Sequence, residues 1–305
     1  MTAKAVPFVV EDMADGDPVE RIGSMMQAEP DQYQTLHERP RRDASPPCVT
    51  TALPPHSARF LGVPLHPITM EETLEHVATA MRENRPLQHV ALNVAKFVKL
   101  RRDPELRADV FGADLVGADG MGIVIGARLL GIRVPERVAG VDLMERILVR
   151  CADEGFRPYL LGARPEILAV AEENLKQRHP KLRLAGSRHG YFSPAEELQV
   201  VENIRLAKPD CLFVGMPTPR KERFMAAHSA SLGVPFVMGV GGGIDVLAGY
   251  VQRAPTAWQR NGFEWLYRIL QEPRRMWWRY LSTNVVYASI LIRALLGKAM
   301  EFRQS

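Results

Sequence analysis

The sequence predicts a Rossmann-like α/β fold, with a mostly parallel sheet, helices on both faces and a helical appendage at the C-terminus. Short apolar runs alternate with helical patterns from residue 89 to residue 240. Several of these runs are apolar throughout, which is typical of strands that are covered on both faces. Three of them end at glycines or polar residues. Such alternation is characteristic of a doubly wound sheet, whose ligands bind beyond the carboxyl ends of its strands.

The elements follow in a regular order. Residues 59–65 predict a short strand or hairpin arm, and Thr69 with Glu72 forms a capping box that begins a helix reaching about Arg85. Strands are then expected at 89–93, 114–118, 157–162, 183–187, 211–216 and 235–240, with helices near 95–110, 121–131, 141–154, 165–179, 194–206 and 217–231. We expect residues 1–57, which are rich in proline and poor in periodicity, to be a disordered leader. The α/β core then spans residues 58–252.

Composition disfavours several classes of protein. The 305 residues are 46% hydrophobic and 24% charged, with a mean hydropathy of −0.13, as in an ordinary globular protein. No apolar run approaches the roughly 18 residues that suggest a bilayer-spanning helix. Cys48, Cys151 and Cys211 are far apart and show neither metal-ligand nor disulfide spacing. We expect no secretion signal, no spanning helix, no metal and no other cofactor.

Charge and aromatic residues concentrate at the C-terminus. Residues 253–305 hold nine Arg or Lys against three Glu, a net charge of +6, while residues 1–252 sum to −2. The same segment holds nine of the 22 aromatic residues, including all four tryptophans. We therefore predict a basic, aromatic, helical appendage over 253–305, interrupted at Pro273. Such a segment is a partner surface, and nucleic acid and an anionic membrane are the two candidates.

Two polar residues follow predicted strands. Asp119 stands between a buried strand and glycines, so it could be a general base or the N-cap of the following helix, and its position favours neither. Asn93 could orient a substrate hydroxyl, although satisfying a turn is the favoured interpretation. Gly120, Gly122 and Gly126 loosely resemble a dinucleotide fingerprint, without the acidic residue expected after the next strand.

Other post-strand residues could contact an anion. Arg137 could bind a phosphate with both ends of its guanidinium, or pair with Glu136 or another carboxylate. Arg220 and Lys221 follow another strand, and a solvated surface position is favoured for both. Glycines at strand ends allow a backbone to approach a ligand, and helix N-termini offer it unpaired amides.

Many motifs in one order resemble a known family. The segments FLGVPLHPITMEETLEHV, ADLVGADGMGIV, RVPERVAGVDL, LFVGMPTPRKE, GVGGGIDVLAG and GFEWLYRILQEPRRMWWRY run from about residue 59 to about residue 284. In this order they resemble the WecB/TagA/CpsF family of glycosyltransferases (glycosyltransferase family 26).

The resemblance implies an inverting, metal-independent transfer of a sugar from a UDP-sugar to an undecaprenyl-diphosphate-linked saccharide, in the synthesis of cell-surface polysaccharides. Asp119 matches the family's catalytic base and Asn93 matches its asparagine, whereas Ala91 stands where many members have threonine. Expected donor-binding residues are Gly120, Gly122, Arg137, Gly162, Gly239, Gly241, Gly242 and Asp245. Arg268, Arg275 and Arg279 are expected to meet the acceptor diphosphate or membrane lipid.

The resemblance also implies partners and a location. The partners are the UDP-sugar, the lipid-linked acceptor and an anionic inner-membrane surface, not nucleic acid, and a homo-oligomer is compatible with the sequence. The protein would be cytoplasmic and peripheral on the cytoplasmic face of the bacterial inner membrane. N-acetylmannosamine, its uronic acid and glucose are the candidate sugars. The alternatives are a nicotinamide-dependent oxidoreductase and a non-enzymatic membrane adaptor.

Overall fold

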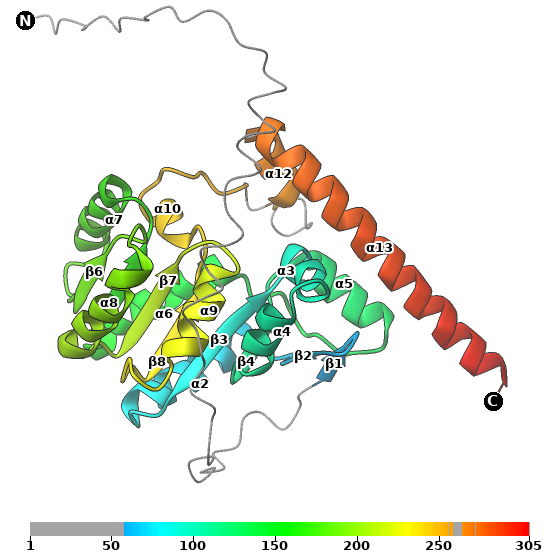
Figure 1. Ribbon diagram of the computed structural model, residues 1–305, viewed down its shortest axis with the longest axis horizontal. Helices are drawn as coiled ribbons and strands as arrows, with labels where there is room; N and C mark the ends of the chain where they lie inside the picture. Colours follow the sequence, from blue (N-terminus) through cyan, green and yellow to red (C-terminus); the bar gives the residue numbers. More distant parts are fainter. Residues whose placement is uncertain (1–57, 256, 259–263, 272, 305) are drawn as a thin grey trace, which may run out of the picture. The chain divides into compact units, whose positions relative to one another are not determined.

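The computed structural model describes residues 58–304, apart from 256, 259–263 and 272, and it confirms the predicted α/β fold (Figure 1). Within these residues, six parallel strands form a sheet in the order β4-β3-β8-β7-β5-β6, and β1 and β2 pair as an antiparallel hairpin. The strands are β1 (Ala58–Phe60), β2 (Val63–Leu65), β3 (Leu87–Leu92), β4 (Leu115–Ala118), β5 (Pro158–Gly162), β6 (Gly186–Arg188), β7 (Cys211–Gly215) and β8 (Phe236–Gly239). The helices are α2 (Met70–Arg82), α3 (Val94–Leu100), α4 (Pro104–Phe111), α5 (Met121–Leu129), α6 (Gly140–Glu154), α7 (Pro165–Arg178), α8 (Pro194–Ala207), α9 (Arg220–His228), α10 (Gly243–Leu247), α12 (Glu264–Gln271) and α13 (Pro273–Gln304).

Helices cover both faces of the sheet. Buried side chains of α3, α4, α5, α8 and α9 join one hydrophobic cluster, and those of α2, α6, α7 and α10 join another. Along β7, Leu212 and Val214 belong to the first cluster and Cys211 and Phe213 to the second, because successive strand side chains point to opposite faces. Both faces of the strand are therefore buried, which explains its uninterrupted apolar sequence.

The topology directs attention to the ends of β3 and β8, which are neighbours in the sheet. The helix that follows β3 is α3, on one face, whereas the helix that follows β8 is α10, on the other. In open α/β sheets, ligands bind at such a change of direction, beyond the carboxyl ends of the strands.

The predicted capping box at Thr69 is confirmed. Its hydroxyl accepts a hydrogen bond from the Glu72 amide at 3.1 Å, and the Glu72 carboxylate accepts from the Thr69 amide at 2.7 Å. The helix that begins here is α2, and its predicted apolar face of Leu74, Val77 and Met81 is buried.

The single helix predicted at 95–110 is wrong, because two helices occupy this segment. The Asp103 carboxylate accepts from the Leu106 amide at 2.9 Å, and Pro104 takes the first helical position, where no amide is needed. A new helix, α4, therefore begins where we expected the first to continue.

Among the other boundaries, a helix and a strand begin later than predicted. The helix expected at 217–231 begins only at Arg220, because Pro217 and Pro219 disfavour helical backbone in the residues before them. The strand expected at 183–187 forms at Gly186–Arg188, where it pairs with β5.

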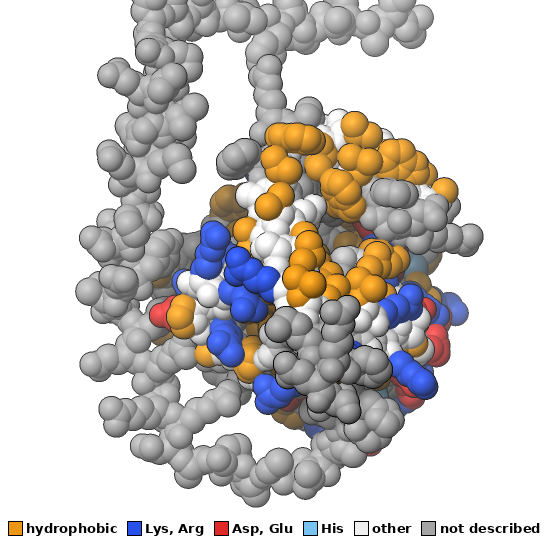
Figure 2. Space-filling view, turned by 90° about the vertical axis from the view of Figure 1, so that its right-hand side faces the viewer, with side chains coloured by type: hydrophobic (Ala, Val, Ile, Leu, Met, Phe, Trp, Pro, Cys, Tyr) orange, Lys and Arg blue, Asp and Glu red, His pale blue; other side chains and the backbone are white. Residues whose placement is uncertain are grey.

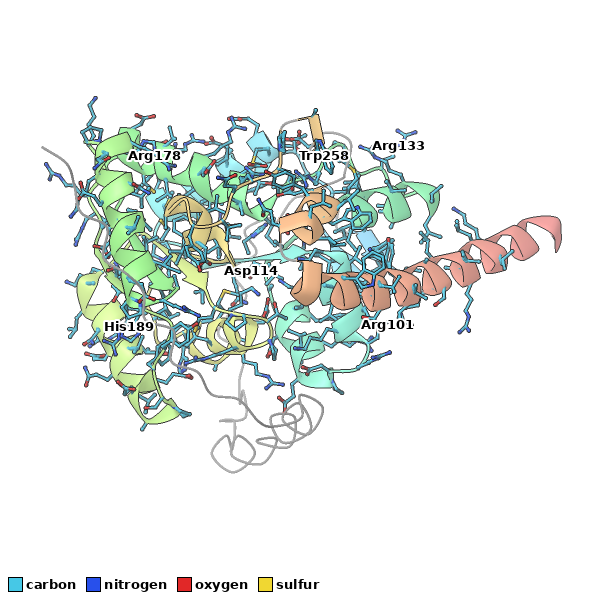
Figure 3. All side chains as sticks on the ribbon, turned by 90° about the horizontal axis from the view of Figure 1, so that it is seen from above. Arg101, Asp114, Arg133, Arg178, His189 and Trp258 are labelled. Atoms are coloured by element: carbon cyan, nitrogen blue, oxygen red, sulfur yellow. The ribbon has the colours of Figure 1, made fainter. Side chains whose placement is uncertain are left out.

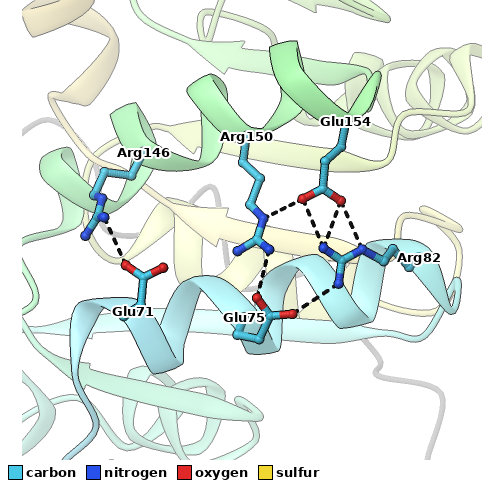
Figure 4. Close-up of polar contacts among 6 residues, drawn as sticks. All are labelled: Glu71, Glu75, Arg82, Arg146, Arg150 and Glu154. Atoms are coloured by element: carbon cyan, nitrogen blue, oxygen red, sulfur yellow. Dashed lines mark hydrogen bonds and ion pairs between the residues drawn. The ribbon is translucent and has the colours of Figure 1, made fainter.

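Ion pairs join the exposed sides of α2 and α6 (Figure 4). Arg150 lies 2.8 Å from Glu75, and Arg82 lies 2.9 Å from Glu154, with Glu71 paired to Arg146 at one end of the row. Single exposed pairs contribute at most about 1 kcal/mol each, so the buried contact between the helices provides more stability than the network.

The C-terminal helix α13 packs on the core. The Tyr287 hydroxyl donates to the Gly122 carbonyl at 2.6 Å, and its ring meets Phe97 edge-on at 5.7 Å. A Cβ on Gly126 would overlap the Tyr287 hydroxyl, so α5 carries a glycine where α13 crosses it. Lys298 donates to the Leu130 carbonyl at 2.9 Å, near the other end of α13.

The two C-terminal helices adjoin at Pro273, as predicted: α12 ends at Gln271 and α13 begins at Pro273. Trp258 lies beside α12 (Figure 3), where its ring meets Tyr267 edge-on at 5.9 Å. None of the helices in the described part of the chain has the length and apolarity needed to cross a bilayer.

His89 provides a pH test of the fold. Its side chain is fully buried against Gly117, and neither ring nitrogen has a hydrogen-bond partner among the described residues. Burial, with smaller contributions from Lys96 and His66, lowers the pKa of His89 to about 3 from its ordinary value of 6.5. Between these values the unfolded chain binds a proton that the folded chain does not. The free energy of unfolding should therefore fall by up to about 1.4 kcal/mol per pH unit as the pH drops from 6.5 toward 3.

Urea denaturation at pH 7.5 and pH 5 measures this slope. We expect His89→Leu to lose that part of the pH dependence, whereas the partly exposed His189→Gln should keep it. Equal slopes in the wild type and the His89 variant would show that the buried imidazole does not control acid stability.

Candidate active site

The ends of β3 and β4 bring the two predicted catalytic residues together. Asn93 follows β3, and Asp119 follows the neighbouring β4. The Asp119 amide donates to the Leu92 carbonyl at 3.0 Å, so the turn after β4 folds across the end of β3. A Cβ on Gly120 would lie 3.4 Å from the Asn93 Cβ, which means that the glycine sits directly against the asparagine.

The Asp119 side chain does not cap the helix that follows it. Gly120 is the N-cap of α5, and no side chain caps that helix. Instead, Asp119 Oδ1 accepts from the Gly140 amide, at the first residue of α6, over 3.1 Å. The N-terminal amides of a helix lack intrahelical partners, so the carboxylate satisfies one of them and meets the positive end of the helix dipole. Among the described residues, the Asp119 carboxylate accepts no other hydrogen bond.

The environment of Asp119 acts on its pKa in both directions. Burial is the largest effect and raises the pKa above the ordinary value, and the nearby Glu264 carboxylate raises it further. The Gly140 amide, Arg137 and Lys96 oppose this shift, and the pKa remains raised. A carboxylate with a raised pKa is a stronger base than an exposed aspartate.

Arg137 connects this site to the C-terminal segment. Its guanidinium lies 2.9 Å from the Glu264 carboxylate, at the first residue of α12. Of the alternatives left open by the sequence, the structure shows a carboxylate partner, but that partner is not Glu136, which accepts from the Met70 amide. Arg253 also approaches Glu264, at 3.9 Å, and is held by Asp142 in the first turn of α6. No local sequence pattern predicts Glu264 as the partner, because it lies 127 positions from Arg137.

Asn93 has a structural role in the described contacts. Its side-chain oxygen accepts from the Lys96 amide at 3.0 Å and caps α3, so the interpretation favoured from the sequence is correct. Its role toward a substrate remains a prediction.

A buried charge cluster, which the sequence did not predict, lies between α3 and α9. Lys96 and Lys221 lie 2.8 and 2.9 Å from the same oxygen of Glu222, and the Thr218 hydroxyl donates to that oxygen at 3.2 Å. Lys96 also donates to the Ala91 carbonyl at 2.8 Å, near the end of β3. The other Glu222 oxygen is buried without a partner among the described residues. The solvated position favoured for Lys221 is therefore wrong.

Burial controls the protonation of this cluster. Desolvation, reinforced by the charge of Lys96, lowers the pKa of Lys221 to about 8. Burial alone would raise the pKa of Glu222, but the two lysines outweigh it and hold the pKa below its ordinary value. Position is the sequence signal for these residues. Lys96 lies three residues after the Asn93 cap, and Lys221 and Glu222 lie in the first turn of α9, the helix that follows β7.

Arg220 is partly buried rather than fully solvated. It donates to the Gly190 and Phe192 carbonyls at 3.0 and 2.7 Å and stacks on the Phe192 ring at 4.5 Å. These contacts join the start of α9 to the loop before α8.

Several predicted donor-binding glycines contact protein in the structure. A Cβ on Gly122 would lie 2.6 Å from Val94, so the fingerprint-like glycines of α5 serve helix packing. Gly162 has a φ of +147°, and a Cβ there would overlap the Gly215 backbone of the neighbouring β7. Since β8 and β7 separate β5 from β3, the structure places Gly162 roughly 14 Å across the sheet from the Asn93 end.

At the end of β8, Gly239 lies against the buried charge cluster. Gly239 packs against the Lys221 side chain, and Gly241 has a φ of +53°, which favours glycine. Gly242 is exposed, and Asp245 lies in the first turn of α10. Donor binding by these residues remains a prediction.

The remaining predicted residues are Arg268, Arg275 and Arg279. Their backbones belong to α12 and α13, but their side chains lie outside the described part of the structure. As for metals, no group of three or more His, Cys, Asp or Glu in the described ranges is placed to hold an ion.

The buried cluster generates a stability prediction. Glu222→Gln leaves two buried lysines without a counter-charge, and breaking such a cluster should destabilise the fold by about 3–5 kcal/mol. Urea denaturation measures the change. Glu105→Gln, which removes an exposed carboxylate 3.1 Å from Arg223, is the matched control and should cost less than about 1 kcal/mol.

A double variant tests the cause. Adding Lys96→Met to Glu222→Gln removes one uncompensated cation. The double variant should therefore lose less free energy of unfolding than Glu222→Gln alone. If the double variant is the less stable of the two, lost packing rather than unpaired charge explains the effect.

Comparison with known protein families matches the chain to the Glycosyl transferase WecG/TagA/CpsF family over residues 58–301. The matched segment contains the whole sheet, the carboxyl edge where Asp119 lies, and nearly all of α13. It therefore covers most of the chain and includes the C-terminal helices as well as the α/β core. The chain belongs to the WecG/TagA/CpsF family of glycosyl transferases.

Proposed function

We propose that this protein transfers a sugar from a UDP-sugar to a saccharide linked to undecaprenyl diphosphate, with inversion at the anomeric carbon. The family supplies the reaction class, glycosyl transfer in the synthesis of cell-surface polysaccharides. The proposed inverting mechanism is supported by Asp119, a half-buried carboxylate with a raised pKa at the carboxyl edge of the sheet. The nicotinamide alternative has no support from α5, whose glycines are used in packing.

In the proposed reaction, an acceptor hydroxyl attacks the anomeric carbon and gives its proton to Asp119. The bond between that carbon and the UDP oxygen breaks, and UDP leaves with the electron pair. Inversion follows from a single displacement. The departing diphosphate gains negative charge, which arginine side chains and the amides at helix N-termini can stabilise. We propose that these groups replace a metal ion in this role.

The donor sugar is a choice between N-acetylmannosamine, its uronic acid and glucose. Ala91, where many relatives have threonine, is buried, and its Cβ lies 3.5 Å from the Cβ position of Gly140. The residue thus faces the same helix N-terminus that binds Asp119. A screen of UDP-sugars for UDP release, with a short-chain lipid-diphosphate-sugar acceptor, identifies the donor.

We further propose that α12 and α13 hold the protein on the anionic cytoplasmic face of the inner membrane. Exposed apolar side chains recur at helical spacing along α13, and each is between 41% and 60% exposed: Trp277, Leu281, Val285, Ile292 and Leu296. Figure 2 shows hydrophobic side chains gathered on this side of the protein, with Lys and Arg side chains near them. Such a surface suits a helix lying among lipid headgroups, where arginines meet phosphates.

The catalytic role of Asp119 is tested by substitution. Asp119→Asn should lower the transfer rate by about 10²–10⁴-fold, because the amide cannot take the hydroxyl proton, while UDP binding should change little. The rate of the wild type should fall as the pH drops below the raised pKa of Asp119, since the base is then protonated. The exposed Asp153→Asn is the control.

A UDP-release assay run with and without EDTA measures both points. Near-wild-type turnover by Asp119→Asn would rule out this residue as the base. Loss of turnover in EDTA, restored by Mg²⁺ or Mn²⁺, would contradict metal independence.

The membrane proposal is tested by cosedimentation with anionic phospholipid vesicles. Replacing Trp277, Leu281 and Val285 by serine should release most of the protein from the vesicles, because it removes buried apolar area from the bound state. Arg275→Glu with Arg279→Glu should weaken binding in a salt-sensitive manner, and a chain truncated after Gly262 should lose both vesicle binding and transfer.

The control for the apolar change is Leu198→Ser with Leu206→Ser, two exposed leucines on α8. Vesicle binding that survives the α13 substitutions, or that falls equally in the α8 control, would show that α13 is not the membrane contact.

A further inference from the structure

A pair of arginines beside Asp119 shares one carboxylate from the C-terminal segment. One Glu264 oxygen lies 2.9 Å from Arg137, and the other lies 3.9 Å from Arg253. Arg137 comes from the loop before α6, and Arg253 from the segment after α10. Glu264 therefore draws together two cations that the chain places 116 positions apart.

The two arginines differ in their other partners. Arg253 is held by both oxygens of Asp142, so it keeps a counter-charge whatever Glu264 does. Arg137 has Glu264 as its one carboxylate partner among the described residues. If Glu264 moved away, the partly buried guanidinium of Arg137, next to Asp119, would have no carboxylate partner among the described residues. Its donors could then bind another anion.

We propose that Glu264 is a built-in competitor of substrate: its carboxylate occupies Arg137 and Arg253, and a diphosphate group displaces it. Carboxylates and phosphates use the same planar fork of guanidinium donors, and a diphosphate carries more negative charge. The proposal deepens the proposed function, on which it rests, by naming the two arginines that meet the diphosphate. It also assigns a role to Arg253.

Accessibility distinguishes this pair from the other charge cluster of the site. The side chains of Arg137, Arg253 and Glu264 are 14%, 19% and 21% exposed, so a solvated anion can reach them. Lys96, Lys221 and Glu222 are 5%, 7% and 1% exposed. Both clusters combine two cations with one shared carboxylate, but only the arginine cluster is open to exchange of its anion.

The test is a titration of the full-length protein with three probes: inorganic pyrophosphate, UDP and citronellyl diphosphate. Calorimetry gives the affinities. Tryptophan fluorescence reports the movement, since all four tryptophans lie at 258–278 and one of them follows Glu264 directly. Pyrophosphate tests whether the arginines bind a diphosphate group at all. UDP and citronellyl diphosphate then show whether that group belongs to the donor or to the acceptor.

Glu264→Gln keeps the size of the side chain and removes its charge. We expect this variant to bind pyrophosphate and at least one of the other two probes about fivefold more tightly, because the competing ion pair is gone. Arg137→Gln should bind the same probes more weakly. Glu145→Gln, which removes a carboxylate near Arg253 that is not bonded to either arginine, should bind like the wild type.

Unchanged or weaker binding by Glu264→Gln would overturn the proposal, as would an equal gain in Glu145→Gln, which would indicate a general charge effect. If Glu264→Gln does not fold, Glu264→Asp replaces it: its shorter carboxylate should also tighten binding, and wild-type affinity would overturn the proposal. UDP-sugar transfer is assayed separately. Tighter pyrophosphate binding without transfer would reject the proposed reaction alone, and transfer with unchanged binding would reject the competition alone.

Discussion

The hydrogen bond from the Gly140 amide to the Asp119 carboxylate joins the carboxyl edge of the sheet to the N-terminus of α6, and the candidate site depends on this connection. It links elements that come from different parts of the chain. On one side, the turn after β4 is held on the end of β3 by the Leu92 carbonyl. On the other, α6 is set against α2 by buried side chains and by a row of ion pairs. Because Arg137 lies in the loop just before α6, this contact brings the acid, the positive end of the helix dipole and an arginine together.

Other buried charges near the carboxyl edge of the sheet are paired with opposite charges. A buried ion requires a partner, and its removal from water costs several kcal/mol unless that partner is close and well oriented. Lys96, Lys221 and Glu222 meet this requirement inside the protein, and in doing so they lock α3 to α9. Arg137 meets it through Glu264, which comes from the C-terminal segment. The first cluster is closed and serves the fold, whereas the second lies where a substrate anion can compete.

The C-terminal helices are part of the same construction. α13 crosses α5 at Gly126, where the Tyr287 hydroxyl fills the space that a Cβ would take, and Gly122 packs against Val94 of α3. Two of the three glycines that suggested a nucleotide-binding loop, Gly122 and Gly126, are thus explained by helix packing. The family match extends through this segment, which agrees with a glycosyl transferase whose α/β core and C-terminal helices are used together. The exposed apolar side chains of α13 lie along the surface that packing on the core leaves uncovered.

The sequence by itself determined the class of fold, the order of strands and helices, and the strand ends where Asn93 and Asp119 lie. These depend on local chemistry, namely apolar runs, capping residues and prolines, which act over a few positions. The break at Asp103 and Pro104 is also a local pattern, an N-cap followed by proline, although we predicted a single helix there. Only the tertiary structure decided that Asp119 binds the α6 amide, that Lys221 is buried and that Arg137 pairs with Glu264. Each of these contacts joins residues at least 21 positions apart, or depends on burial by distant elements, so no local pattern encodes it.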